Sequence, residues 1–365
     1  MLEIKTNHFI DLPENFFKVK NNLIQNYRLD SDHLAEIKFL FSPLNPFFKE
    51  GKAYVEVVED RARAALLIHP DYSMGDNPIA YLAYFECENE KNLCKQLLRR
   101  CEDIAKENGI HRIIGPINFN TYHQYRINLN LEQKDPFFNE PKNPPYYGHL
   151  LEQNGYQILN KYVSYIVENK TTIEKWLAIY GPKKSLLVFD NQYEYISLTP
   201  SLWMKNLAEI HQKSEMIFND NFAYTATDFN LFSLKYGEQF SQMFCPLTSI
   251  LVKHKTDGLV GILLNFPNYE DLKENLQLDQ QISFDNYMQN VKSPTLLLKT
   301  LGLLPNHRQL GYQILRMLIE VTPNALENYD RYIFCMMQKE NYPAKLGSEF
   351  KDEEKHYALY YKDLK

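Results

Sequence analysis

The sequence contains no long hydrophobic run. None of its apolar stretches approaches the ~20 residues that a membrane-spanning helix requires. The opening segment, MLEIKTNHFIDLPENF, also lacks a basic segment followed by an apolar one, which is the pattern of a secretory signal. We therefore expect a cytoplasmic protein with no membrane partner.

Closely spaced cysteine pairs are also missing. None of the five cysteines forms a CxxC pair, and Cys87, Cys94 and Cys101 recur every seven residues, a spacing that a zinc site does not need. The ten histidines include no HExxH motif. The sequence thus predicts reduced thiols in a protein core and no bound metal.

The chain has no excess of positive charge. Its formal net charge is −6, whereas a dedicated nucleic-acid-binding protein is usually basic, so nucleic acid is disfavoured as a partner. Hydrophobic residues make up 44% of the chain and aromatic residues 14%, which excludes a disordered protein. A length of 365 residues fits two domains.

Two halves of the chain share one pattern of predicted elements. Each half contains a pair of strands, an apolar strand, an amphipathic helix and a further strand. In the first half these elements lie at residues 53–58, 64–69, 79–85, 91–108 and 111–115. In the second half they lie at residues 247–254, 258–265, 295–303, 308 onward and 332–337. This alternation predicts an α/β fold with a domain boundary between residues 168 and 184.

The start of the second-half helix indicates a ligand. Pro305 ends the apolar strand, and Arg308 to Gly311 then open the helix. The first N–H groups of a helix have no partner within it and carry partial positive charge, so a diphosphate can accept hydrogen bonds from them. Gly311 would let the backbone come close to a phosphate, and His307 and Arg308 add donors or positive charge.

The corresponding turn of the first half has the opposite charge. The segment FECENEKN places Glu86, Glu88 and Glu90 where the second half has arginine and glycine. These acids would repel a diphosphate at close range. We therefore expect one cofactor site, in the second half, and a first half that serves as a scaffold, a lid or the acceptor-binding side.

The segment from Arg308 to Gln313 resembles the Arg/Gln-x-x-Gly-x-Gly/Ala signature of the GCN5-related N-acetyltransferase (GNAT) superfamily. Gln313 stands where the family has a small residue. Asn341 is similar to an asparagine that many of these enzymes place near the pantetheine arm of CoA; the alternative is that it caps a turn or helix. Motifs along the whole chain, among them GPIN at 115–118 and NPPYY at 143–147, are similar to those of bacterial tandem GNAT-like proteins, whose substrates are mostly unassigned.

The resemblance implies two tandem GNAT-like domains, each a mixed, mostly antiparallel twisted sheet flanked by helices. Residues 1–180 would form a degenerate domain, and residues 181–365 a domain that binds acetyl-CoA or another acyl-CoA. The cofactor-binding residues implied are Leu301, Leu303, Leu304, Arg308, Gln309, Leu310, Gly311, Tyr312, Gln313 and Asn341.

The resemblance also implies direct transfer of the acyl group to an amine of a small molecule or a protein. A backbone N–H within residues 301–304 would stabilise the oxyanion. Many GNAT enzymes keep a carboxylate on the strand before the cofactor turn, and the strand at 295–303 has none. The catalytic residues therefore stay unidentified, with Lys299 and Tyr342 as the remaining candidates.

Polar and aromatic residues follow the strand at 111–115, where open α/β sheets place ligands. The candidate acceptor-binding residues there are Asn118, Tyr122, His123 and Arg126. For the NPPYY segment further along the chain, the alternative to ligand binding is a rigid turn at residues 143–145 with tyrosines packed on it.

Three functions stay open. The first is an acyl-CoA-dependent N-acyltransferase. The second is a non-catalytic module that binds acyl-CoA or a partner, which the missing strand carboxylate favours. The third is an aminoacyl transferase that uses charged tRNA, against which the acidic net charge argues. The sequence does not indicate the oligomeric state.

Overall fold

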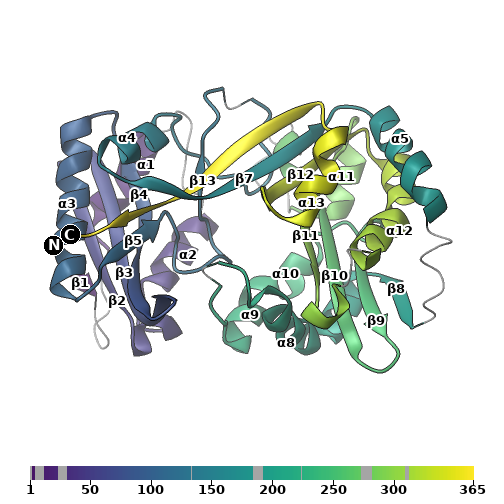
Figure 1. The fold of residues 1–365 in the computed structure, drawn as a ribbon, viewed down its shortest axis with the longest axis horizontal. Helices are drawn as coiled ribbons and strands as arrows, with labels where there is room; N and C mark the ends of the chain where they lie inside the picture. The colour runs from purple at the N-terminus through teal and green to yellow at the C-terminus, as the bar shows by residue number, and fades with distance from the viewer. Residues whose placement is uncertain are drawn as a thin grey trace. The chain divides into compact units, whose positions relative to one another are not determined.

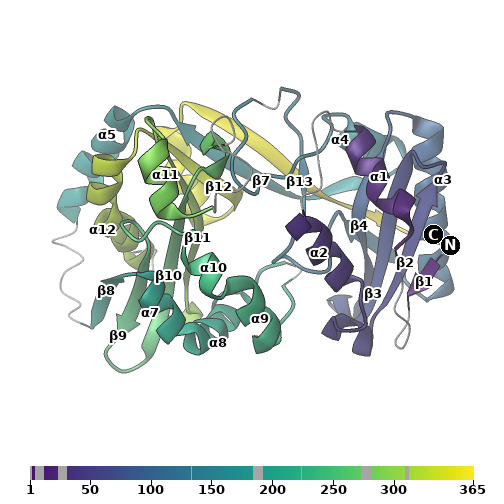
Figure 2. The same ribbon diagram turned by 180° about the vertical axis from the view of Figure 1, so that it is seen from behind.

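A computed structural model describes residues 2–4, 12–23, 31–132, 134–183, 192–222, 224–272, 282–308 and 312–365. Over these ranges the chain forms two compact units, each with a sheet flanked by helices (Figures 1 and 2). None of the helices in these ranges has the length and apolar character needed to span a bilayer.

The two units do not coincide with the two halves of the chain. Unit 1 comprises Met1–Lys134, Asn139–Lys161 and His356–Lys365, and unit 2 comprises Asp135–Phe138 and Tyr162–Lys355. The structure thus differs from the predicted division at residue 180, because residues 162–180 belong to unit 2 and the C-terminal strand belongs to unit 1. Local sequence patterns identify a strand but do not say which sheet it joins.

Unit 1 contains a sheet in the order β1-β2-β3-β4-β5-β13, with β6 paired to β13. Only β4 and β5 run parallel to each other; the other neighbours are antiparallel. The strands are β1 (Leu2–Ile4), β2 (Lys52–Val58), β3 (Ala62–Met74), β4 (Asn77–Cys87), β5 (Arg112–Gly115), β6 (Ile127–Asn128) and β13 (Glu353–Asp363). The helices are α1 (Glu14–Leu23), α2 (Ser31–Leu40), η1 (Pro46–Lys49), α3 (Lys91–Glu107) and α4 (Tyr147–Gln153).

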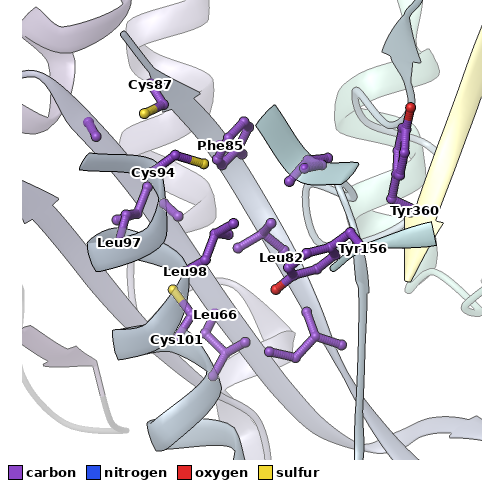
Figure 3. Close-up of a cluster of buried hydrophobic side chains, with 14 of the residues drawn as sticks. Leu66, Leu82, Phe85, Cys87, Cys94, Leu97, Leu98, Cys101, Tyr156 and Tyr360 are labelled. Carbon is purple, nitrogen blue, oxygen red and sulfur yellow. The ribbon is translucent and has the colours of Figure 1, made fainter. Parts of the chain in front are cut away.

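The core of unit 1 lies between this sheet and α3. Figure 3 shows Leu97, Leu98 and Cys101 of α3 close to Leu66 and Leu82 of the strands. This face of α3 is buried, as its 3.6-residue periodicity predicts. All five cysteines are free thiols in buried positions, which confirms the predicted core role.

The α3 helix ends where the sequence predicts. Gly109 directly follows the C-cap residue Asn108 and has φ +73°, a left-handed conformation that glycine adopts without steric cost.

Unit 2 contains a sheet in the order β7-β12-β11-β10-β9-β8, in which only β11 and β12 are parallel. The strands are β7 (Gln157–Val167), β8 (Tyr193–Ser197), β9 (Ile250–His254), β10 (Gly258–Pro267), β11 (Thr295–Leu303) and β12 (Arg331–Gln338). The helices up to β10 are α5 (Lys170–Tyr180), η2 (Gly181–Lys183), α7 (Pro200–Lys205), α8 (Leu207–Phe218), α9 (Phe229–Tyr236) and α10 (Glu238–Ser241). Those after β10 are η3 (Tyr269–Leu272), α11 (Phe284–Asn290), η4 (Pro305–His307), α12 (Tyr312–Asn328), α13 (Tyr342–Gly347) and η6 (Ser348–Phe350).

The predicted second-half elements are confirmed. The hairpin of β9 and β10 turns at Asp257-Gly258, and Gly258 has φ +68°. Helix α12 buries Leu315, Leu318 and Ile319, which pack with Trp176 of α5. The fold is therefore α/β, with two tandem domains that each carry a mixed, mostly antiparallel sheet.

Candidate functional site

The parallel strands β11 and β12 separate part-way along their length. Their pairing runs from Thr295↔Arg331 to Leu298↔Phe334 and then stops, although both strands continue. The pairing of β12 with β7 shifts between Phe334 and Met337, and Met336 in that interval has φ +46°. A bulge of this kind bends a strand and increases its twist. It explains why β12 leaves β11 at this point.

The residues at the separated ends of both strands are only partly buried. Residues 299–301 of β11 and residues 336–338 of β12 are half-exposed, whereas residues 295–297 and 332–333 are buried. Unit 2 therefore has a gap in the backbone pairing of two strands, directly before the turn that leads into α12, and side chains beside this gap are half-buried.

Unit 1 has the same strand arrangement, but its gap is closed. The parallel pairing of β4 and β5 covers Ala80↔Ile113 and Tyr81↔Ile114. Past this point the loop after β5 continues the contacts. The N–H of Ile117 donates to the carbonyl of Leu82 at 2.9 Å.

The side chain of Asn118 completes this closure. Its Oδ1 accepts from the N–H of Tyr84 at 2.9 Å, and Tyr84 has φ +51°. The rings of Tyr84 and Phe119 both pack on Phe41 at 5.2 Å between ring centroids. The residues that follow the parallel pairing on β4 are buried. The corresponding space in unit 1 is thus filled by the protein itself.

The turn before α3 carries paired carboxylates, as the sequence predicts. Arg61 donates to Glu88 at 2.8 Å and to Glu90 at 2.7 Å. Glu86 is buried, accepts from the Tyr147 hydroxyl at 2.7 Å and lies 3.8 Å from Arg63. These carboxylates lie in the turn directly before α3, and Arg61 offsets the charge of two of them.

The turn before α12 is braced by Arg308. Its Nε donates to the carbonyl of Leu303 at 2.8 Å, one terminal nitrogen donates to the carbonyl of Ile217, and the other lies 3.6 Å from Asp220. The sequence suggested that Arg308 offers donors to an anion. In the structure its donors instead tie the turn to the end of α8.

His307 also has a different role from the one expected. It is buried, and its Nδ1 lies 2.7 Å from the hydroxyl of Tyr193. Burial and the neighbouring His254 lower the pKa of His307, so the ring is neutral at neutral pH. It therefore adds no positive charge for an anion.

Three of the predicted cofactor-binding residues lie outside the described residues: Gln309, Leu310 and Gly311. The description resumes at Tyr312, the first residue of α12, whose side chain is 52% exposed. Gln313 is half-buried, and its Oε1 accepts from the hydroxyl of Tyr195. The glutamine that replaces the small residue of the motif is thus held by β8.

Comparison with solved structures identifies the fold. A GCN5-related N-acetyltransferase from Anabaena variabilis matches with a TM-score of 0.50 at 11% identity, over 100% of this chain and 73% of that one. The fold is that of the GCN5-related N-acetyltransferases. No protein-family model matches the chain, and neither does any curated protein sequence. At this identity the similarity shows the GNAT fold alone, so the function has to be argued from the site.

Two further structures are similar over most of the chain at lower TM-scores. One is a tandem GNAT protein from the clavulanic acid biosynthesis pathway, with a TM-score of 0.42 and 10% identity over 96% of this chain and 93% of that one. The other is the C-terminal domain of a putative lysylphosphatidylglycerol synthetase from Agrobacterium fabrum, with a TM-score of 0.39 and 11% identity over 95% and 91%.

Strand β11 and the residue that follows it hold four more of the predicted cofactor and catalytic residues of the GNAT-fold unit 2. Leu301 is half-exposed at the gap, whereas Leu303 and Leu304 are buried. The N–H of Leu304 donates to the carbonyl of Val260 at 2.8 Å, so it is already used by β10. The Lys299 ammonium donates to the carbonyl of Phe138. Here Lys299 acts as a hydrogen-bond donor, and a catalytic role for it stays a prediction.

Asn341 and Tyr342 lie after the separated end of β12. Asn341 is exposed at the N-cap position of α13, and its N–H donates to the carbonyl of Gln338 at 2.9 Å. Tyr342 is 43% exposed, and partial burial raises the pKa of its phenol, to which Tyr180 and Tyr312 also contribute. The structure thus brings Tyr342 near Tyr312 at the start of α12, which the sequence did not indicate.

The four predicted acceptor-binding residues of unit 1 form a loop with many internal contacts. Asn118 closes the β4–β5 gap, and the N–H of Tyr122 donates to Asn120 at 3.0 Å. His123 Nδ1 lies 3.1 Å from Glu36, and the Arg126 guanidinium lies over the ring of Tyr125 at 3.9 Å. This network supports a structural role for the loop, and acceptor binding by these residues stays a prediction.

Proposed function

We propose that unit 2 binds an acyl-CoA, acetyl-CoA above all, and transfers the acyl group directly to an amine of a small molecule or a protein. The observation that carries this proposal is the gap between β11 and β12. It lies at the start of a long helix and is half-exposed in unit 2, whereas the same place in unit 1 is closed by the chain and flanked by carboxylates.

The start of α12 suits the pyrophosphate of CoA, and the unpaired edge of β11 suits its pantetheine arm. The pyrophosphate would accept hydrogen bonds from the first N–H groups of α12, where the helix dipole favours negative charge. The pantetheine arm carries amide groups, and these can pair with the backbone edge of β11 beyond Leu298, as an added strand does. Leu301 lies on this strand, Tyr312 begins α12, and Asn341 directly precedes α13.

Tyr342 is the group best placed to hold a proton for the reaction. An acyl thioester supplies an electrophilic carbonyl and a thiolate leaving group. A tyrosine phenol, with an ordinary pKa of about 10, is protonated at neutral pH and can donate to the departing thiolate. We assign Tyr342 the role of general acid.

A second function is favoured by a specific observation. Strand β11 contains no acidic residue, and its one amine, on Lys299, is occupied by a backbone carbonyl. Unit 2 would then keep the acyl-CoA site without the base that catalysis needs, as a binding module. Aminoacyl transfer from tRNA stays the least supported of the three functions, since the net charge is −6.

The cofactor site is tested by calorimetric titration of the full chain with acetyl-CoA and CoA. We expect saturable binding that Gly311→Glu abolishes, because a carboxylate at the helix start repels the pyrophosphate. Asn92→Glu is the matched control, since it puts the same charge at the exposed start of α3 in unit 1 and should leave binding unchanged. Absence of binding to the wild-type chain, or equal loss in both variants, would overturn the proposal.

Release of free CoA in the presence of a library of amines then separates the two functions. A transferase releases CoA only when an acceptor is present, and a binding module releases none.

A further inference from the structure

Two histidines and an aspartate come together beside the turn that leads to α12. His254 ends β9, Asp257 lies in the turn between β9 and β10, and His307 ends η4. Asp257 Oδ2 lies 3.2 Å from His254 Nδ1 and 3.0 Å from His307 Nε2. One ligand atom from each residue can be chosen so that all three lie within 4.8 Å of one another.

The two separations from Asp257 Oδ2 are close to those between neighbouring ligands of one metal ion. Ligand atoms bound tetrahedrally to zinc at about 2.0–2.2 Å lie roughly 3.3 Å apart. The two imidazoles are borderline donors that zinc and neighbouring first-row metals accept and that magnesium and calcium avoid, while the carboxylate is a hard donor that either group accepts.

His307 presents a buried ring nitrogen to the site. Its side chain is 5% exposed, and its Nε2 is buried without a well-directed hydrogen bond. On the other side of the ring, Nδ1 lies 2.7 Å from the hydroxyl of Tyr193. When Nδ1 carries the proton and donates it to the Tyr193 oxygen, Nε2 keeps its lone pair for the site. This is the usual outer arrangement of a metal-binding histidine.

Asp257 completes the donor set and keeps it accessible. Its side chain is 42% exposed, so an ion can enter from solvent. The Thr256 hydroxyl donates to Asp257 Oδ1 at 2.9 Å. Oδ2 faces both imidazoles.

We propose that His254, Asp257 and His307 form a binding site for a divalent first-row transition metal of the zinc class, with water as the fourth ligand. The ion would join the turn between β9 and β10 to η4. It would thereby anchor the segment directly before Arg308. The proposal is independent of acyl-CoA binding, because none of the three side chains lies in the gap between β11 and β12.

The test is titration of the chelator-treated full chain with Zn²⁺, followed by calorimetry and by competition with a fluorescent zinc indicator. We expect one ion per chain and no comparable binding of Mg²⁺. His307→Ala and Asp257→Asn should each weaken binding by about 100-fold or more, since loss of a direct ligand exceeds the 10- to 100-fold effect of an outer partner. Tyr193→Phe should weaken it by about 10-fold through that outer contact.

One control variant and a second site variant keep the test decisive. His149→Ala removes an exposed histidine of unit 1 and should leave zinc affinity unchanged. Asp257→Asn alters an exposed turn, so it reports on the site even if His307→Ala fails to fold.

Co²⁺ bound at the site should show the visible absorption of a four-coordinate ion. A wild-type chain that binds no zinc, or an Asp257→Asn variant that binds it as tightly as wild type, would show that the three groups are a metal-free hydrogen-bonded cluster.

Discussion

At the scale of single residues, Tyr342 carries the catalytic part of the proposed function. It begins α13, close enough to Tyr312 at the start of α12 for their phenols to interact electrostatically. Partial burial raises its pKa, which favours the protonated form in the folded chain. A phenol is protonated near neutral pH with or without this shift, so Tyr342 can donate its proton to a departing thiolate.

Tyr342→Phe removes this proton and little else. We expect kcat for acyl transfer to fall by about 100-fold, while the dissociation constant for acetyl-CoA stays the same. The wild-type rate should hold through neutral pH and decline only above the ordinary tyrosine pKa of about 10, because the folded pKa is higher still. Steady-state kinetics and a pH–rate profile measure both effects, and Tyr361→Phe in β13 is the control. An unchanged kcat would remove Tyr342 from the mechanism.

At the scale of elements, the turn before α12 depends on close packing of α8 against β11. A Cβ on Gly302 would overlap Ile217 Cγ2 and lie 2.9 Å from the ring of Phe218, both at the end of α8. The same end of α8 accepts the hydrogen bond from Arg308. The helix end, the strand and the turn therefore hold one another in place.

Gly302→Ala should destabilise unit 2 by about 1–3 kcal/mol, since extra volume in a packed contact forces neighbouring groups to shift. Denaturant unfolding measures the loss. Gly181→Ala is the matched control: Gly181 has φ −55°, and a Cβ there would lie 3.4 Å from Leu177, an ordinary contact. The control should stay within about 0.5 kcal/mol of wild type. Equal stability of the two variants would contradict the packing argument.

At the scale of the whole molecule, each sheet ends on a strand from the other half of the chain. The C-terminal part of β13 joins β5 of unit 1, and residues 162–167 of β7 join β12 of unit 2. In β13, Tyr357, Ala358 and Tyr360 are buried in unit 1, while Tyr361 is half-exposed. Unit 1 therefore requires the end of the chain to complete its core.

A chain that ends at Lys355 should lose the ordered state of unit 1. Removing Tyr357, Ala358 and Tyr360 exposes core surface, and loss of one large aromatic side chain alone costs about 3–5 kcal/mol. Hydrogen exchange should rise across α3 and β5, with less change in α12. Removal of Lys365 alone is the control and should have no effect. Retained protection of α3 in the shortened chain would show that β13 is dispensable.

Local patterns were enough to predict most elements of the fold. The apolar stripes of α3 and α12, the turn at Asp257-Gly258 and the stop at Gly109 all depend on neighbours a few residues away, and the structure confirms them. The acidic turn of unit 1 could also be predicted from the sequence, because its glutamates lie close together in the chain. The role of Arg308 could not be predicted from the sequence, because the carbonyl of Ile217 that accepts its hydrogen bond is remote in the chain.

The sequence by itself determined the α/β class, the order of the elements and the charge difference between the two helix starts. These features follow from side-chain periodicity and from charge at adjacent positions. Tertiary structure decided where β11 and β12 part, that the same gap is sealed in unit 1, which sheet receives β13, and that His307 meets His254 and Asp257. Each of these depends on pairing between segments that lie far apart in the chain, and no local pattern encodes such pairing.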